Sequence, residues 1–206
     1  MESTVPEETP LSKLSADIGT VMPAVDSSTD GQYGAGIGSE DETRQLDLLL
    51  ERLREYDHWY RDVEREVSYP SKRAKCDIVL PDGTPVECKL IRYWRANGDP
   101  EDYMPKAIFS PFHENTILTD VEDLHASDFE REGGLLGLFY KRSDDDSQAV
   151  QRLPERYTAE DLAEKIARDI EYWYDIEATV SNIARVEGLQ HSIHKQGAAI
   201  TWRIES

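Results

Sequence analysis

The sequence has few cysteines, few lysines and no long apolar run. Two cysteines are too few for a four-cysteine zinc site, and no histidine pair lies near them at ligand spacing. We therefore expect Cys76 and Cys88 to be small, buried core residues. No segment approaches the roughly 18 consecutive apolar residues of a membrane-spanning helix, so we expect no membrane association.

Acidic residues outnumber basic residues by 42 to 23, only eight of the basic residues are lysine, and the formal net charge is -19. This balance is unusual for a nucleic-acid-binding protein, because Lys and Arg normally provide affinity by releasing counterions from phosphates. At 1 M salt the Debye length falls to about 3 Å, so DNA hardly senses a charged surface. We therefore expect a cytoplasmic protein of a halophilic, archaeal cell; an ordinary acidic cytosolic protein is the alternative.

The domain organisation follows from a change in composition near residue 40. Residues 1–40 hold scattered Ser, Thr, Pro, Gly and acidic residues without a sustained apolar period. Such a segment buries too little surface to offset its chain entropy, which predicts a disordered acidic N-terminal tail. Residues 41–206 are predicted to form one compact domain.

Within this domain we expect an α/β fold with a central mixed sheet flanked by helices. Apolar residues recur at spacings of three and four from residue 46 to residue 67, which predicts a long amphipathic helix ending at Tyr69-Pro70. Its start carries the acidic residues Glu40, Asp41 and Glu42, which suit the positive end of a helix dipole. The later predicted elements are helices over 101–109 and 115–124, a buried strand over 134–140, a helix capped by Thr158, and a strand over 198–204.

A β-hairpin follows the first helix. The apolar runs 76–80 and 86–91 are separated by Pro81-Asp82-Gly83, and a three-residue loop ending in Gly suits a type I turn followed by a left-handed residue. This loop places Leu80 opposite Thr84 and therefore Asp77 opposite Glu87. Side chains alternate along a strand, so Lys89 shares the Glu87 face, while Cys76 and Cys88 lie opposite each other on the other face. A two-residue loop would shift the register by one.

Asp77, Glu87 and Lys89 form a pattern suited to cutting phosphodiesters. Cross-strand neighbours have Cβ atoms roughly 4.5–5.5 Å apart, so two carboxylates there repel each other unless a cation lies between them. Mg²⁺ is commonly held by one or two carboxylates and several waters, and we expect Mn²⁺ to substitute for it. An ammonium beside the attacking water then completes the site. The alternative is an ordinary salt-bridged strand surface.

This arrangement resembles the PD-(D/E)XK phosphodiesterase superfamily, which includes type II restriction endonucleases. The resemblance implies a restriction endonuclease-like core running helix, strands, helix, strand. From about residue 60 onward the chain is also similar to an uncharacterised restriction-endonuclease-like group. That similarity is carried by Arg92, Asn97-Gly98, Ser110-Pro111, Thr119-Asp120, the run 134–140 and the His191-x-x-His194 segment between Gly188 and Gly197.

The resemblance assigns roles to matched residues. Asp77 and Glu87 correspond to metal ligands, and Lys89 corresponds to the lysine that positions or activates water. The superfamily often adds a glutamate from the first helix, for which Glu66 is the first candidate, with Glu64 and Glu55 as alternatives. The chain lacks the proline that often precedes the first acid.

Arginines and histidines near the predicted site are candidates for DNA contact. Arg92 and Arg95 flank two aromatic residues after the catalytic strand and suit phosphate or guanine, with solvated arginines as the alternative. His191 and His194, three apart in a loop, are candidates for DNA contact, for metal binding or for structural hydrogen bonds.

Together these features predict a Mg²⁺-dependent DNA endonuclease that serves restriction or defence against foreign DNA. The alternatives are a repair or recombination nuclease, and a non-catalytic DNA-binding or assembly module on a nuclease fold. Cutting both strands favours a homodimer, because closed two-fold dimers are the commonest oligomers. The aromatic cluster 172–174 is its candidate interface, and burial of that cluster in the chain's own core is the alternative.

Overall fold

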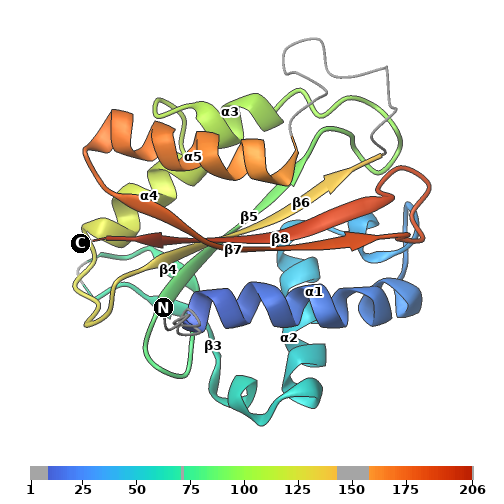
Figure 1. Ribbon diagram of the computed structural model, residues 1–206, viewed down its shortest axis with the longest axis horizontal. Coiled ribbons are helices and arrows are strands. Elements are labelled where there is room, and N and C mark those ends of the chain that lie inside the picture. Colours follow the sequence, from blue (N-terminus) through green and yellow to red (C-terminus); the bar gives the residue numbers. More distant parts are fainter. Residues whose placement is uncertain (1–8, 71, 143–157, 206) are drawn as a thin grey trace, which may run out of the picture.

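A six-stranded mixed sheet forms the centre of the protein (Figure 1). The computed structural model describes residues 9–70, 72–142 and 158–205. The strands are β3 (Glu64–Ser68), β4 (Lys75–Val79), β5 (Pro85–Arg92), β6 (Gly134–Lys141), β7 (Ala178–Glu187) and β8 (Gln196–Ile204). Their order across the sheet is β3-β4-β5-β6-β8-β7. Among the strand pairs of these described ranges, only β5 and β6 are parallel.

Helices cover both faces of this sheet, which confirms the predicted α/β class (Figure 1). One face carries α1 (Pro10–Ser28) and α2 (Glu42–Tyr56), and the other carries α3 (Met104–Phe109), α4 (Ile117–His125) and α5 (Ala159–Tyr174). Within the described part of the chain, no helix is long and apolar enough to cross a membrane. The smaller elements are the two-stranded sheet of β1 (Asp30–Gly31) and β2 (Gly34–Ala35) and the 3-10 helices η1 (Ile37–Ser39) and η2 (His58–Asp62).

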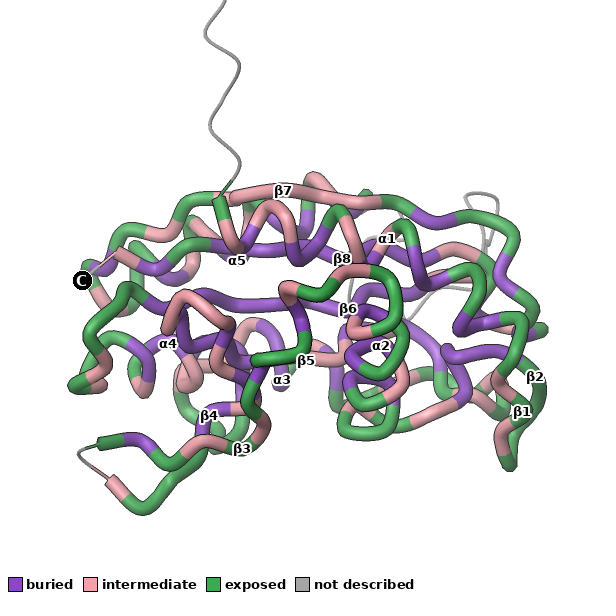
Figure 2. The backbone as a smooth tube through the Cα atoms, turned by 90° about the horizontal axis from the view of Figure 1, so that it is seen from below, coloured by how far each residue is buried: buried purple, intermediate pink, exposed green. Residues whose placement is uncertain are grey.

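The sheet separates two apolar cores, one beneath α1 and α2 and one beneath α3, α4 and α5. Strand β6 is buried along almost its whole length, as its continuous apolar run predicts (Figure 2). Strand β7 is an edge strand and is mostly half-buried. The predicted cap of α5 is present, because the Thr158 hydroxyl accepts from the Asp161 N–H at 3.1 Å.

The prediction of a disordered N-terminal tail is wrong for the described part of that segment. Residues 10–28 form α1, which begins at a Thr9 capping box with Pro10 in the first turn. Its side chains Leu14, Ile18 and Met22 are fully buried in the core that α1 shares with α2. Helix α1 is therefore part of the domain, and residues 1–8 lie outside the described ranges.

The first predicted helix is shorter than expected. Helix α2 begins where the acidic run predicts, with the Asp41 side chain accepting from the Arg44 N–H at 2.8 Å. It ends at Tyr56, and Asp57 then caps η2. The chain continues as the edge strand β3, so residues 64–68 are extended and not helical.

Candidate active site

The hairpin of β4 and β5 has the predicted register. Ile78 lies opposite Val86, and the Leu80 N–H donates to the Thr84 carbonyl at 2.9 Å. Gly83 occupies the left-handed region with a φ of 92°, as the three-residue loop requires. Counting outward from Ile78 and Val86 places Asp77 opposite Glu87.

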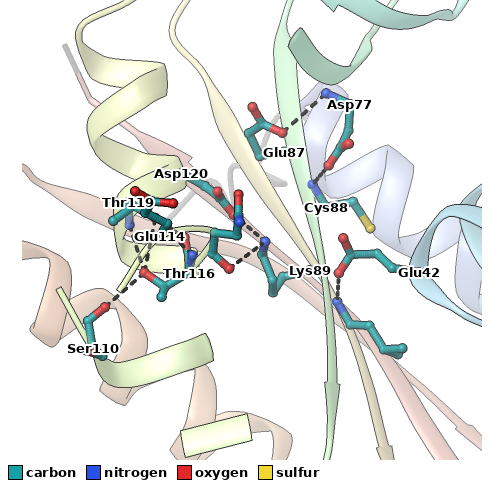
Figure 3. Close-up of polar contacts among 12 residues, drawn as sticks. Glu42, Asp77, Glu87, Cys88, Lys89, Ser110, Glu114, Thr116, Thr119 and Asp120 are labelled. Atoms are coloured by element: carbon teal, nitrogen blue, oxygen red, sulfur yellow. Dashed lines mark hydrogen bonds and ion pairs between the residues drawn. The ribbon is translucent and has the colours of Figure 1, made fainter. Parts of the chain in front are cut away.

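Backbone pairing between β4 and β5 ends at Ile78 and Val86. Beyond that point, N–H groups of β5 donate to side-chain carboxylates instead of to the β4 backbone. The Cys88 N–H donates to the Asp77 carboxylate at 2.7 Å, and the Leu90 N–H donates to the Glu42 carboxylate (Figure 3). Two acids from different elements therefore occupy the edge of β5 that β4 has left open. We call this opening the β5 notch.

Glu87 is a buried carboxylate at the β5 notch, with only 9% of its surface exposed. The Tyr69 hydroxyl and the Asp77 N–H donate to its two oxygens. Burial, together with the neighbouring Asp77 carboxylate, raises the pKa of Glu87 to about 8. This part of the notch favours either a proton or a cation.

Lys89 approaches the notch from the face that carries α4. Its ammonium lies 2.8 Å from the Asp120 carboxylate and 3.5 Å from the Asn115 carbonyl oxygen (Figure 3). Burial lowers the pKa of Lys89, but the charges of Asp120, Glu42 and Asp77 outweigh burial and raise it above its ordinary value. Lys89 therefore stays protonated and positively charged at neutral pH.

Three carboxylates act on this one ammonium, those of Asp120, Glu42 and Asp77, and Glu87 lies beside Asp77. Burial raises the pKa of both Glu42 and Asp120, and the Lys89 charge opposes that rise. The donors are all hard oxygen ligands of the kind that Mg²⁺ and Mn²⁺ take. Among the described residues, no three His, Cys, Asp or Glu side chains are gathered closely enough to form a metal centre. A cation here would complete its coordination shell with water.

The structure does not bring Glu66 to this site. Glu66 is exposed on β3, and its carboxylate pairs with the Lys75 ammonium at 3.0 Å. The alternatives Glu64 and Glu55 are also exposed. The acid that joins Asp77 from a helix is Glu42, in the first turn of α2.

The two cysteines are buried, as predicted, but they do not share a face. Cys76 packs into the core beneath α3, α4 and α5, whereas Cys88 packs into the core beneath α1 and α2. The β3–β4 pairing skips Glu66 and Asp77, and Glu66 has a left-handed φ of 49°. We attribute the error to this interruption, because simple alternation of side chains does not continue across it.

Arg92, the last residue of β5, and Arg95 line an open hollow of about 420 Å³, together with Glu40, Asp41 and Asn97. Both guanidinium groups lie near the Glu101 carboxylate, at 3.5 and 3.4 Å. The Arg95 side chain is half exposed and the Arg92 side chain is 20% exposed. Arg95 is therefore the more accessible of the two for a phosphate.

His191 and His194 are fully buried, which places neither ring at a surface that DNA can reach. The rings stack with centroids 4.8 Å apart. The His191 Nδ1 accepts from the Ile193 and His194 N–H groups at 3.2 Å, and the His194 Nε2 lies 2.8 Å from the Trp94 carbonyl oxygen. Burial lowers the pKa of both rings, that of His194 to about 4. These contacts support the structural alternative.

No protein-family model, curated protein or solved structure matches the chain. The function therefore has to be inferred from the chemistry of the β5 notch.

Proposed function

We propose that this chain is a Mg²⁺-dependent DNA endonuclease built on a restriction endonuclease-like core, with restriction or defence against foreign DNA as its role. The observation that carries the proposal is the meeting of Asp77, Glu87 and Lys89 at an opening in the sheet, with a glutamate from α2 beside them. A repair or recombination nuclease would use the same chemistry.

The donor set at the notch fits a hard divalent cation. Asp77 and Glu87 lie close enough to raise the pKa of Glu87, so a cation between them would replace a repulsive contact with an attractive one. Asp77 and Glu87 would hold the ion, with water as its remaining ligands, and Glu42 would act on it only through its nearby charge. When bound, Mg²⁺ or Mn²⁺ neutralises charge on the scissile phosphate and makes water easier to ionise.

Lys89 would supply a second positive charge. Its ammonium is anchored by Asp120 and by the carbonyl of Asn115, so it is held in place before the substrate arrives. Preorganised charge of this kind stabilises the negative charge that develops on the phosphate during hydrolysis. In this scheme Asp120 acts as a positioning residue, because it holds Lys89 and does not itself contact the phosphate.

The test is cleavage of plasmid and linear DNA in molar KCl with Mg²⁺, Mn²⁺ or EDTA. We expect Asp77→Asn, Glu87→Gln and Lys89→Met each to reduce cleavage by about 10²-fold or more, as loss of a transition-state contact does. Glu42→Gln tests the charge contributed by the helix glutamate. Glu66→Gln is the matched control, because this exposed glutamate sits on the neighbouring strand and should leave cleavage unchanged.

Metal-dependent cleavage that persists in the Asp77 and Lys89 variants would place the activity elsewhere. Titration calorimetry with Mn²⁺ in the presence of DNA tests the non-catalytic alternative. If no Mn²⁺ binds and no DNA is cut, the notch is a structural ion-pair cluster on a binding or assembly module.

A further inference from the structure

Three large aromatic side chains lie exposed together at the end of α5 and in the loop before α4. Phe112 is 81% exposed, Tyr172 is 79% exposed and Trp173 is 43% exposed. The Trp173 ring contacts both others edge to face, with centroids 5.5 Å from Phe112 and 5.1 Å from Tyr172. We call these three residues the aromatic patch. Exposed apolar clusters of this kind commonly mark binding sites.

One residue of the aromatic patch shares a hollow with two residues that contact Lys89. This hollow of about 430 Å³ is lined by Phe112, Asn115 and Asp120, together with the acidic residues Glu114 and Asp123. Asn115 and Asp120 are the two residues that hold the Lys89 ammonium, and Figure 3 shows Asp120 beside Lys89. A chain lying in this hollow would therefore touch Phe112 as well as the residues that hold Lys89.

We propose that the aromatic patch stacks unpaired bases, so that the substrate is DNA with a single-stranded stretch beside the bond that is cut. This inference rests on the proposed nuclease function and names its substrate class. Aromatic rings stack on any base, but only when the base face is free, which excludes an uninterrupted duplex.

The charges around the hollow favour stacking over a phosphate clamp. Two lysines other than Lys89 already have carboxylate partners: Lys72 pairs with Asp123, which lines the hollow, and Lys165 of α5 pairs with Asp169 at 2.6 Å. Neither ammonium is free to clamp a phosphate there. A chain with a net charge of -19 would then hold DNA by contacts that do not depend on counterion release.

The size of the patch argues against a second copy of the chain as its occupant. If each ring offers roughly 150–250 Å², the exposed fractions leave about 300–500 Å² of aromatic surface. A stable interface buries about 800 Å² on each partner, so the patch alone is too small for a homodimer.

The experiment measures binding of a fluorescent oligothymidylate, and of a blunt duplex of equal length, by anisotropy in EDTA and molar KCl. We expect tighter binding of the single strand. Trp173→Ala and Phe112→Leu should each weaken that binding on the order of ten-fold, because each removes a ring face. Trp173→Phe keeps a ring and should retain most of the affinity. Tyr56→Ala removes an exposed ring at the end of α2 and is the control, with binding unchanged.

Equal affinities for all variants would overturn the inference. Light scattering that shows a dimer, converted to a monomer by Phe112→Leu, would also overturn it and assign the patch to a second copy. Cleavage assays with Mg²⁺ separate the two proposals. Normal cutting by the patch variants would reject the stacking proposal and leave the nuclease proposal standing. Binding that depends on the rings, without any cutting by wild type, would reject the nuclease proposal alone.

Discussion

Glu87→Gln should stabilise the protein when no metal is present. The folded-state pKa of Glu87 is raised from 4.5 to about 8, so the folded protein binds more protons than the unfolded chain between these values. Stability is then lost as pH rises through this window, which is the opposite of a salt-bridged carboxylate. Near pH 7 folded Glu87 is therefore still mostly protonated, and holding that proton costs about 3 kcal/mol relative to the ionised carboxylate of the unfolded chain, at 1.36 kcal/mol per pKa unit.

Glutamine would remove most of this cost. Its carbonyl can still accept from the Tyr69 hydroxyl, and its amide can donate to the Asp77 carboxylate. The contact with the Asp77 N–H, at 3.3 Å, is lost, and a net hydrogen bond contributes about 1 kcal/mol. We therefore expect a gain of about 2 kcal/mol, or roughly 5 °C in Tm for a chain of this size.

Thermal melts in EDTA and in excess Mn²⁺, with KCl held constant, provide the assay. Wild type should gain about 2.7 kcal/mol at a metal concentration 100 times its Kd, while Glu87→Gln should gain much less. The difference in stability between Glu87→Gln and wild type should therefore become smaller or change sign when metal is added. Glu66→Gln serves as control and should match wild type in both buffers. A Glu87→Gln protein that is less stable than wild type in EDTA would refute the reasoning and make Glu87 a structural acceptor.

Three further outcomes are expected. Burial lowers the pKa of His194 from 6.5 to about 4. Neutral His194 therefore contributes about 3 kcal/mol to the free energy of unfolding above pH 6.5, and this contribution is lost as pH falls toward 4. In urea melts, the free energies of unfolding of wild type and His194→Gln should converge as the pH is lowered across this range. Leu14→Ala in α1 should destabilise the protein by about 2–5 kcal/mol in denaturant melts, whereas an unstructured tail would tolerate it. Melting temperatures in low and in molar KCl test the halophilic expectation: Tm should rise with salt as repulsion is screened, and equal values would contradict it.

The hairpin could be predicted from the sequence because its register depends on local chemistry. Pro81-Asp82-Gly83 specifies the turn, and alternation along the strands then places Asp77 opposite Glu87. The prediction fails for Cys76, where the β3–β4 pairing is interrupted beside a left-handed Glu66. A counting argument cannot anticipate a backbone irregularity that depends on tertiary contacts.

The sequence places Glu66 on the first helix because a residue spacing of four fits both a helix and a strand. Val63 and Val67 continue the apolar pattern of α2 by helical spacing, yet four residues are also two full periods of a strand. In the structure α2 ends at Tyr56, and the helix glutamate that lies beside Asp77 is Glu42, not Glu66. The acidic run at the start of α2 indicates the start of a helix, but nothing in the sequence indicates that Glu42 lies beside Asp77.

Helix α1 and strand β7 were missed for different reasons. In α1 the apolar residues have helical spacing, but Ser, Thr, Gly and an internal Pro23 between them resemble a disordered composition. In β7 a register shift between Val180 and Asn182 breaks the alternation that identifies a strand. Asp120 had a signal in the Thr119-Asp120 pair, but only the folded chain shows that it meets Lys89.

Several locally unfavourable features lie around the β5 notch. Strand pairing stops at Ile78, Glu87 is a carboxylate buried beside another, and Asn115 holds its carbonyl toward Lys89 with a left-handed φ of 58°. Folding alone does not require these features, because a paired hairpin with apolar side chains would be more stable. Departures of this kind concentrate where a ligand compensates for them. Their convergence on one opening supports a bound cation and phosphate more strongly than any single residue of the motif does.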